Sequence, residues 1–228
     1  MNRNGNSSGL VFLFDVDNTL LDNDSIRADL QHHLISEVGR ERTKAYWRIF
    51  EQLWSQLGYA DYLGALQRYR AEYPRDPHLL TVSHFLIEYD FAKRLLPDAL
   101  KVAQRANERG LAVVLSDGDV VFQPLKIARS GLARAVSGRV LIYVHKEQEL
   151  DDVEQRYPAE HYIFIDDKLR ILSAVKDVWH SRVTTVFVRQ GQYANDPKIL
   201  GSYPAADLTI ERIGDLQCEL SELVEATR

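Results

Sequence analysis

The sequence predicts an α/β fold, in which a doubly wound parallel sheet carries an inserted bundle of helices. Two observations support this class. Five short, nearly continuous apolar runs recur along the chain, as expected for strands that are covered on both faces. One long interval, residues 21–91, contains no such run and shows helical spacing instead.

The apolar runs are the predicted strands. They lie at Leu10 to Phe14, Leu111 to Leu115, Val140 to Val144, Tyr162 to Ile165 and Val183 to Val188. Helical stretches separate the later runs, for example Pro97 to Arg109 before Gly110, and Lys168 to Trp179. Strands that alternate with helices form βαβ units, and these units build a parallel sheet.

The long interval predicts a small bundle of four helices. Its clearest helix places one apolar face at Tyr46, Phe50, Leu53, Trp54 and Leu57 and ends at Gly58. The other three run from Ile26 to Val38 before Gly39, from Tyr62 to Tyr69, and from Leu79 to Tyr89 after Pro77. We therefore assign residues 1–21 and 92–228 to a core and residues 22–91 to the inserted helical bundle.

Composition and charge exclude several kinds of partner. The chain has 228 residues, of which 45% are hydrophobic and 27% charged, an ordinary globular composition. Its formal net charge of −5 provides no broad cationic field, so we expect neither nucleic acid nor a membrane as partner. No apolar run reaches the length of a membrane span.

The ends of the sequence favour a cytoplasmic protein. The segment Met1 to Gly9 is polar and lacks the apolar centre of a secretory signal, so we interpret it as a frayed tail. Cys218 is the only cysteine, which excludes an internal disulfide and a thiolate metal cluster.

Polar residues follow four of the five predicted strands. They are Asp15 and Asp17, then Ser116 and Asp117, then Lys146, and finally Asp166 and Asp167. Ligands of open parallel sheets bind beyond the carboxyl ends of the strands, so these residues are expected to share one pocket. Carboxylates so close together repel one another, and a hard divalent cation relieves that repulsion. Mg²⁺ prefers oxygen ligands, so it is the predicted cofactor.

The motifs resemble those of the haloacid dehalogenase-like (HAD) hydrolase superfamily. The resemblance rests on Asp15-Val16-Asp17-Asn18-Thr19-Leu20, followed by Ser116, Lys146 and Asp166-Asp167, and extends over about residues 10–216. It implies a Rossmann-like core with a helical cap between the first and second motifs. The interval between Ser116 and Lys146 is too short for the larger cap that other members insert there.

The resemblance also implies a role for each motif residue. Asp15 would be the nucleophile that forms an aspartyl phosphate, and Asp17 would protonate the leaving group and then activate water. Lys146 would offset charge on the phosphoryl group. The implied phosphate-binding residues are Asn18, Ser116, Asp117 and Lys146, and the implied metal ligands are Asp15, Asp17, Asp166 and Asp167, with Asp166 preferred over Asp167 as the distal ligand.

Other interpretations stay open at this point. Asp15 and Asp17 could be ordinary capping carboxylates, and Lys146 lacks the flanking glycine and proline that many relatives carry. Dehalogenase members lack an acid at the position of Asp17, and phosphonate-cleaving members use a cap lysine, for which Lys44 is available. A phosphotransferase or mutase would share every motif, and a non-catalytic phosphate-binding regulator is a further alternative.

The sequence therefore predicts a magnesium-dependent phosphohydrolase, a phosphomonoesterase that acts on a small phosphorylated metabolite. It does not indicate an oligomeric state.

Overall fold

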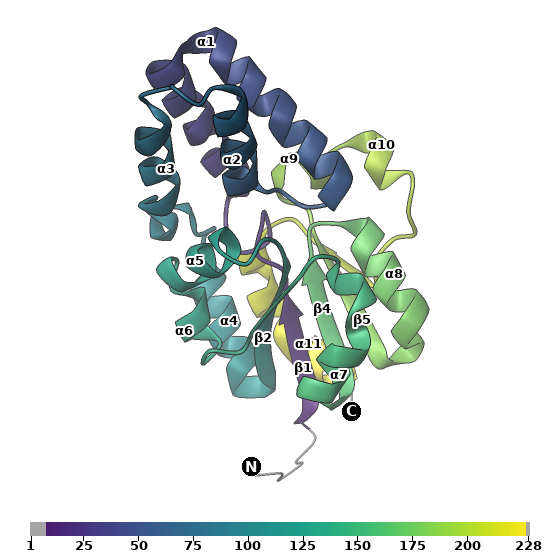
Figure 1. Cartoon of the computed structure of the whole chain (residues 1–228). Coiled ribbons are helices and arrows are strands. Elements are labelled where there is room, and N and C mark those ends of the chain that lie inside the picture. Colours follow the sequence, from purple (N-terminus) through teal and green to yellow (C-terminus); the bar gives the residue numbers. More distant parts are fainter. Residues whose placement is uncertain (1–7, 227–228) are drawn as a thin grey trace.

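A computed structural model of the chain describes residues 8–226. Its centre is a six-stranded parallel sheet in the order β3-β2-β1-β4-β5-β6 (Figure 1). The strands are β1 (Ser8–Phe14), β2 (Leu111–Asp117), β3 (Val140–Tyr143), β4 (Ala159–Asp166), β5 (Val183–Val188) and β6 (Leu208–Ile210). The predicted α/β class and doubly wound parallel sheet are confirmed.

The five predicted strands are all present, with shifted ends. Strand β1 begins at Ser8, so Ser8 and Gly9 belong to the sheet rather than to the predicted tail, whose residues 1–7 lie outside the described part. Strand β3 ends at Tyr143, one residue early, and Val144 is exposed. Strand β6 was not predicted, because three residues are too few to show a pattern.

Helices cover both faces of the sheet. The helices of the core are α4 (Ala99–Arg109), α5 (Phe122–Arg129), α6 (Leu132–Ala135), α7 (Leu150–Arg156), α8 (Leu169–Trp179), α9 (Gly191–Ala194), α10 (Pro197–Leu200) and α11 (Leu216–Ala226). Short 3₁₀ turns, η1 to η4, occupy Phe91–Arg94, Lys146–Gln148, His180–Arg182 and Ile213–Asp215.

Strand β1 lies at the centre of the hydrophobic core. Phe12 and Phe14 face the cluster that includes α4, α5 and α11, whereas Val11 and Leu13 face the cluster that includes α7 and α8. All four side chains are fully buried, which explains why the run is apolar at every position.

The helical region between β1 and β2 contains α1 (Asn23–Leu57), α2 (Tyr62–Glu72) and α3 (Leu79–Ile87). Helix α1 begins after Asp22, whose carboxylate accepts a hydrogen bond from the Ser25 amide at 2.9 Å. It ends at Gly58, which adopts the left-handed conformation. As predicted, two helices lie on either side of Gly39, whose φ of 77° and ψ of 168° are not helical, and the label α1 covers both. They lie alongside each other, because Arg27 in the first pairs with Glu51 in the second at 2.7 Å (Figure 1).

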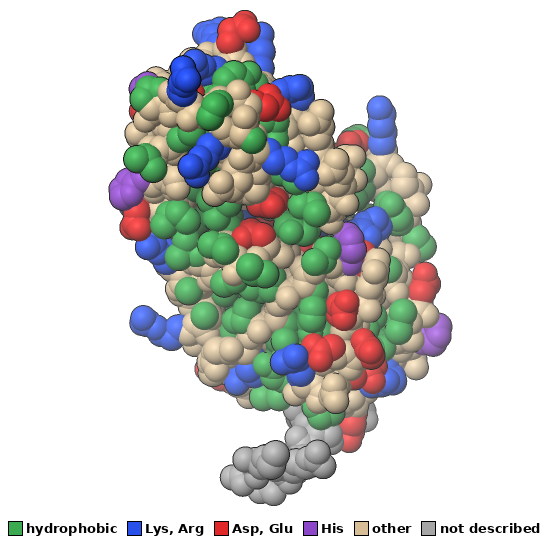
Figure 2. Space-filling model, viewed as in Figure 1, with side chains coloured by type: hydrophobic (Ala, Val, Ile, Leu, Met, Phe, Trp, Pro, Cys, Tyr) green, Lys and Arg blue, Asp and Glu red, His purple; other side chains and the backbone are tan. Residues whose placement is uncertain are grey.

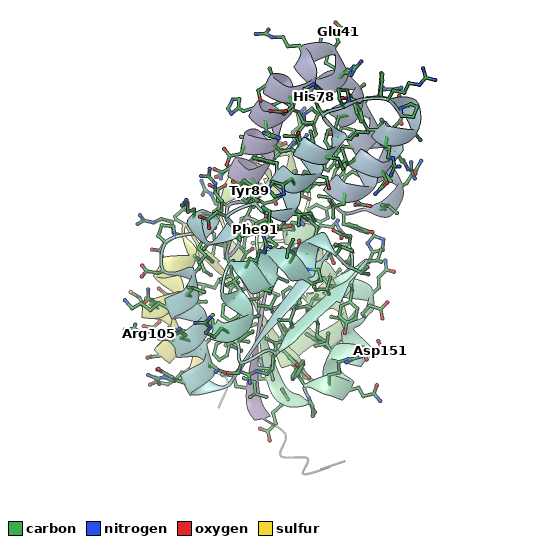
Figure 3. The ribbon with its side chains drawn as sticks, turned by 60° about the vertical axis from the view of Figure 1, so that its left-hand side comes forward. Glu41, His78, Tyr89, Phe91, Arg105 and Asp151 are labelled. Atoms are coloured by element: carbon green, nitrogen blue, oxygen red, sulfur yellow. The ribbon has the colours of Figure 1, made fainter. Side chains whose placement is uncertain are left out.

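Two chain crossings connect this helical region to the core, and they lie side by side. The Asp22 amide donates to the Arg94 carbonyl at 2.7 Å, and the Leu96 amide donates to the Leu20 carbonyl at 3.0 Å. Near this junction Tyr89 and Phe91 pack together, with ring centroids 5.2 Å apart (Figure 3).

The junction places the helical region over the carboxyl edge of the sheet (Figure 1). Residues 22–91 as a separate domain remain a prediction.

Candidate active site

The carboxyl ends of β1 and β4 define the site. These two strands are neighbours although they are far apart in sequence, and Phe14 pairs with Ile165 in the parallel register. Asp15 and Asp166 therefore emerge side by side at the same edge of the sheet. This edge between β1 and β4 is the switch point where open α/β sheets bind their ligands.

Three buried carboxylates gather at this edge. Asp15, Asp166 and Asp167 each offer an oxygen, and these oxygens lie within 4.8 Å of one another. Burial, with the nearby charge of Asp15, raises the pKa of Asp166 to about 6, although Lys146 acts in the opposite direction. Burial also raises the pKa of Asp167 well above its ordinary value. The raised pKa values indicate that the nearby cations do not fully compensate the negative charge of the three carboxylates.

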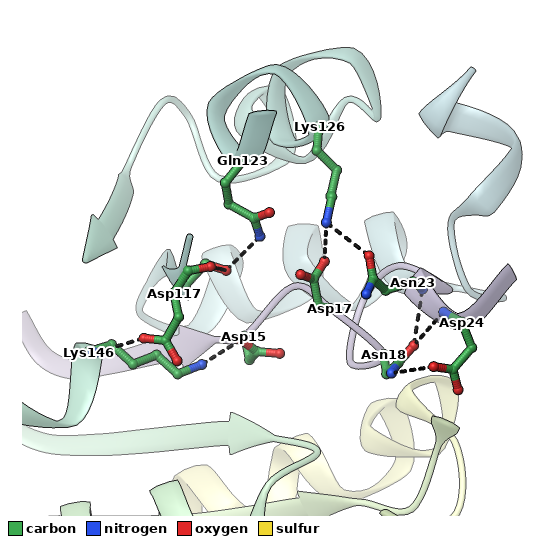
Figure 4. A network of polar contacts seen from close by, with 10 residues as sticks. Asp15, Asp17, Asn18, Asn23, Asp24, Asp117, Gln123, Lys126 and Lys146 are labelled. Carbon is green, nitrogen blue, oxygen red and sulfur yellow. Dashed lines mark hydrogen bonds and ion pairs between the residues drawn. The ribbon is translucent and has the colours of Figure 1, made fainter. Parts of the chain in front are cut away.

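Lys146 is the main cation inside the cluster. Its side chain is fully buried, and its Nζ lies 2.5 Å from Asp15 Oδ1 (Figure 4). The same Nζ lies 2.7 Å from Asp166 Oδ2. The Lys146 amide donates to Asp117 Oδ1 at 2.8 Å, which fixes the position of the loop after β3. Burial lowers the pKa of Lys146, but the attraction of Asp15, Asp166 and Asp117 outweighs burial and raises the pKa above its ordinary value.

The cluster fits a divalent cation. Asp15 Oδ2 and both side-chain oxygens of Asp167 are buried and have no hydrogen-bond partner within the described residues. Buried carboxylate oxygens are rarely left without a partner unless an ion or water completes them. Lys146 and Lys168 lie beside the four acids Asp15, Asp117, Asp166 and Asp167, and a divalent cation would reduce the remaining excess of negative charge.

Asp17 lies apart from the three clustered acids. Its Oδ1 accepts a hydrogen bond from Lys126 Nζ at 2.7 Å, and Lys126 also donates to Asn23 Oδ1 at 3.0 Å (Figure 4). The Asp17 carboxylate belongs to the cavity wall rather than to the group formed by Asp15, Asp166 and Asp167. The Asp17 carboxylate is thus not one of the three clustered carboxylates, and a role for Asp17 in metal binding stays a prediction.

Asn18 shapes the turn after β1. Its φ of 61° is left-handed, as the sequence suggested for this position. The Asn18 side-chain oxygen accepts hydrogen bonds from the backbone amides of Asn23 and Asp24 at 3.0 and 3.2 Å. The backbone amide of Asn18 donates to the Leu21 carbonyl. These groups are used within the turn, so a direct phosphate contact by Asn18 stays a prediction.

Ser116 is buried at the end of β2. Gln123, itself buried, donates to the Ser116 hydroxyl oxygen at 2.8 Å. The Ser116 hydroxyl in turn donates to the Asp117 carbonyl at 3.3 Å, and the Asp117 carboxylate accepts a hydrogen bond from the Lys146 amide.

Sequence reasoning missed two functional candidates, Gln123 and Lys126. Both lie on α5, where the buried positions are Phe122, Gln123, Lys126 and Ile127. The sequence contained a signal for them, because helical spacing places Gln123 and Lys126 on the same face as the apolar Phe122 and Ile127.

A cavity of about 640 Å³ joins the strand ends to the helical region. Its core side includes Asp17, Asp117 and Asp167, and its helical side includes Phe50 and Trp54. Figure 2 shows acidic side chains between apolar ones where the two regions meet. Lys44 is exposed on α1 and is not part of the cavity wall.

Comparisons with known proteins agree with this geometry. The model of the haloacid dehalogenase-like hydrolase family matches residues 10–178. A solved structure of a protein from Burkholderia xenovorans LB400, assigned to the haloacid dehalogenase-like hydrolases, is 62% identical, with a TM-score of 0.88, and the match covers 91% of this chain and 97% of that one. No curated protein matches the chain.

More distant structures share the fold. A HAD hydrolase from Bacillus subtilis bound to magnesium is 17% identical, with a TM-score of 0.61 over 92% of this chain and 97% of that one. The L-2-haloacid dehalogenase from Xanthobacter autotrophicus is 20% identical, with a TM-score of 0.58 over 93% and 98%.

The fold and the clustered strand ends define a Rossmann-like hydrolase. The chain belongs to the haloacid dehalogenase-like hydrolase family. The family predicted from the motifs is therefore confirmed. Within residues 8–226, no helix is both long and apolar enough to cross a membrane.

Proposed function

We propose that the protein is a phosphomonoesterase that works through a covalent intermediate on Asp15. The observation that carries this proposal is the second carboxylate, Asp17, which lines the cavity next to the acidic cluster. A phosphate ester needs an acid to protonate the departing alcohol oxygen, whereas a halide leaves without a proton. Asp17 therefore favours phosphate esters over haloacids.

Asp15 is suited to nucleophilic attack. Lys146 holds Asp15 Oδ1, while Asp15 Oδ2 has no hydrogen-bond partner among the described residues. In the first step this free oxygen forms a bond to phosphorus, and the bond from phosphorus to the alcohol oxygen breaks. Asp17 gives the alcohol its proton. In the second step water attacks the phosphorus of the aspartyl phosphate, Asp17 takes the proton of that water, and Asp15 is released.

Lys146 and Ser116 stabilise the transferring group. The Lys146 ammonium offsets negative charge that builds on the phosphoryl oxygens, and the Ser116 hydroxyl, oriented by Gln123, can donate a hydrogen bond to one of them.

Asp15, Asp166 and Asp167 would hold Mg²⁺. When bound, this cation neutralises charge on the phosphoryl group and on the carboxylates. The position of its side chain leads us to assign Asp17 to proton transfer rather than to metal binding.

A small metabolite fits the cavity. Its volume of about 640 Å³ lies in the range of small-molecule sites. The helical region, with the proposed boundaries 22–91, would act as a cap that covers the strand ends and limits access by water.

The test is hydrolysis of a generic aryl phosphate. Wild-type protein with Mg²⁺ should release phosphate, and Asp15→Asn should lower kcat/KM by roughly 10³-fold or more because the nucleophile is lost. A chelator should also remove the activity, and added Mg²⁺ should restore it.

Two outcomes would contradict the proposal. Full activity in Asp15→Asn would exclude the covalent mechanism. Halide release from a 2-haloacid without phosphatase activity would assign the protein to the dehalogenases.

A further inference from the structure

The helical wall of the cavity is aromatic. Phe50, Trp54, Tyr59 and Tyr62 all line it. Phe50 and Tyr62 are buried and stack on each other, with ring centroids 5.0 Å apart. Trp54 differs from them, because its side chain is 50% exposed. Within residues 8–226 no other aromatic ring packs against Trp54, so its indole ring is free to stack on a ligand.

The arginines in the cavity wall are already neutralised. Arg27 on α1 pairs with Glu51 at 2.7 Å, and Arg170 on α8 pairs with Glu147 at 2.6 Å. Lys168 lies beside the acidic cluster, where Asp167 and the other acids balance its charge. Each of these three cations therefore already has an acidic partner, and none is left to pair with a carboxylate on the leaving group. The cavity therefore favours a leaving group without charge.

The pair Arg27 and Glu51 also offers hydrogen bonds. Both side chains are about half exposed, at 49% and 51%, and both line the cavity. Arg27 can donate and Glu51 can accept, so together they suit the edge of a ring that carries both kinds of group.

We infer that the substrate is a monophosphate of a neutral alcohol that carries a flat heteroaromatic ring, as a nucleoside does, and that this ring stacks on Trp54. The inference rests on the proposed phosphomonoesterase function. The phosphate lies at the strand ends near Asp15, and the ring lies under α1, where its edge meets Arg27 and Glu51. The cavity, at about 640 Å³, is large enough to hold a nucleoside monophosphate.

A matched pair of substrates tests the inference. Uridine 5′-monophosphate and ribose 5-phosphate release the same primary alcohol group and share the ribose, but only the first carries a base. We expect kcat/KM to be roughly tenfold higher, or more, for the nucleotide, because stacking of a base on an aromatic side chain has about this effect. Trp54→Ala should lower the ratio of the two kcat/KM values by the same order, and Trp54→Phe should restore part of it.

The control variant is Val178→Ala, which truncates a side chain on α8 that is 57% exposed and outside the cavity wall. It should leave the ratio unchanged. Equal kcat/KM values for the two substrates, no hydrolysis of either, or a Trp54→Ala variant that keeps the wild-type ratio would each overturn the inference.

Failure of the proposed function would look different. In that case not even the aryl phosphate would be hydrolysed in an Asp15-dependent way. Activity on the aryl phosphate without a preference for the nucleotide would overturn only the substrate inference.

Discussion

Lys146 compensates two buried acids at once. Its ammonium is fully buried and contacts both Asp15 and Asp166. Removing one partner of a buried ion pair leaves an uncompensated charge, which costs more than the pair itself contributes. We expect Lys146→Met to lower the free energy of unfolding of the metal-free protein by about 3 kcal/mol or more at pH 7. Urea unfolding in the presence of a chelator measures this loss.

Lys126→Met is the matched control. Lys126 is equally buried, but its carboxylate partner, Asp17, has a side chain that is 22% exposed and can be solvated when the lysine is gone. The loss of stability should therefore be smaller than in Lys146→Met. Equal losses in the two variants would show that the double contact of Lys146 does not matter.

At the scale of elements, the sequence predicted the strands better than the contacts of the helices. The strands were predictable because burial on both faces makes each run apolar, and the residue that follows each run marks the site. Asp15 and Asp166 were found in this way. Strand β6 was too short to produce such a run.

Residues on helices were harder to assign. A lysine or glutamine on a helix is usually solvated, and only the packing of α5 against the strand ends brings Lys126 to Asp17 and Gln123 to Ser116. Gly39 was expected to end a helix, and it does: its non-helical torsion angles separate the two helices of α1.

Gly58, at the end of α1, packs against His145, the residue that precedes Lys146 in the loop after β3. It adopts φ of 79°, and a Cβ at this position would lie 2.5 Å from the His145 ring. We expect Gly58→Ala to lower the free energy of unfolding by about 1–2 kcal/mol from backbone strain. It should also lower kcat/KM, because a displaced His145 moves its neighbour Lys146. Unfolding and aryl phosphate kinetics measure the two effects.

Gly138→Ala separates strain from contact. Gly138 has φ of 77°, nearly the same as Gly58, but an added Cβ would meet nothing within 4 Å. This variant should show the backbone cost alone and keep wild-type kinetics. If Gly58→Ala behaved in the same way in both assays, the contact with His145 would have no functional effect.

For the whole molecule, the acidic site makes stability depend on pH. The folded state raises the pKa of Asp166 from 3.8 to about 6, so folding favours its protonated form. Its unfavourable contribution is present in full above pH 6 and disappears as the pH falls below the unfolded value.

The variant Asp166→Asn should therefore be more stable than wild type at pH 7 in a chelator, by up to about 3 kcal/mol. This advantage should shrink toward zero near pH 4, as thermal unfolding at the two pH values can show. Added Mg²⁺ should stabilise wild type more than the variant. A stability difference that stayed constant with pH would contradict this account.

The paired chain crossings constrain how the helical region can approach the sheet. A single connecting segment allows rotation about its own bonds, but here residues 20–22 and 94–96 are hydrogen-bonded to each other and have to move together. We therefore expect the helical region to tilt relative to the sheet but not to rotate about its connections. Trp54 would then take the same position over the strand ends in every catalytic cycle. The substrate selectivity would thus depend in part on the two hydrogen-bonded connections, which contact no substrate.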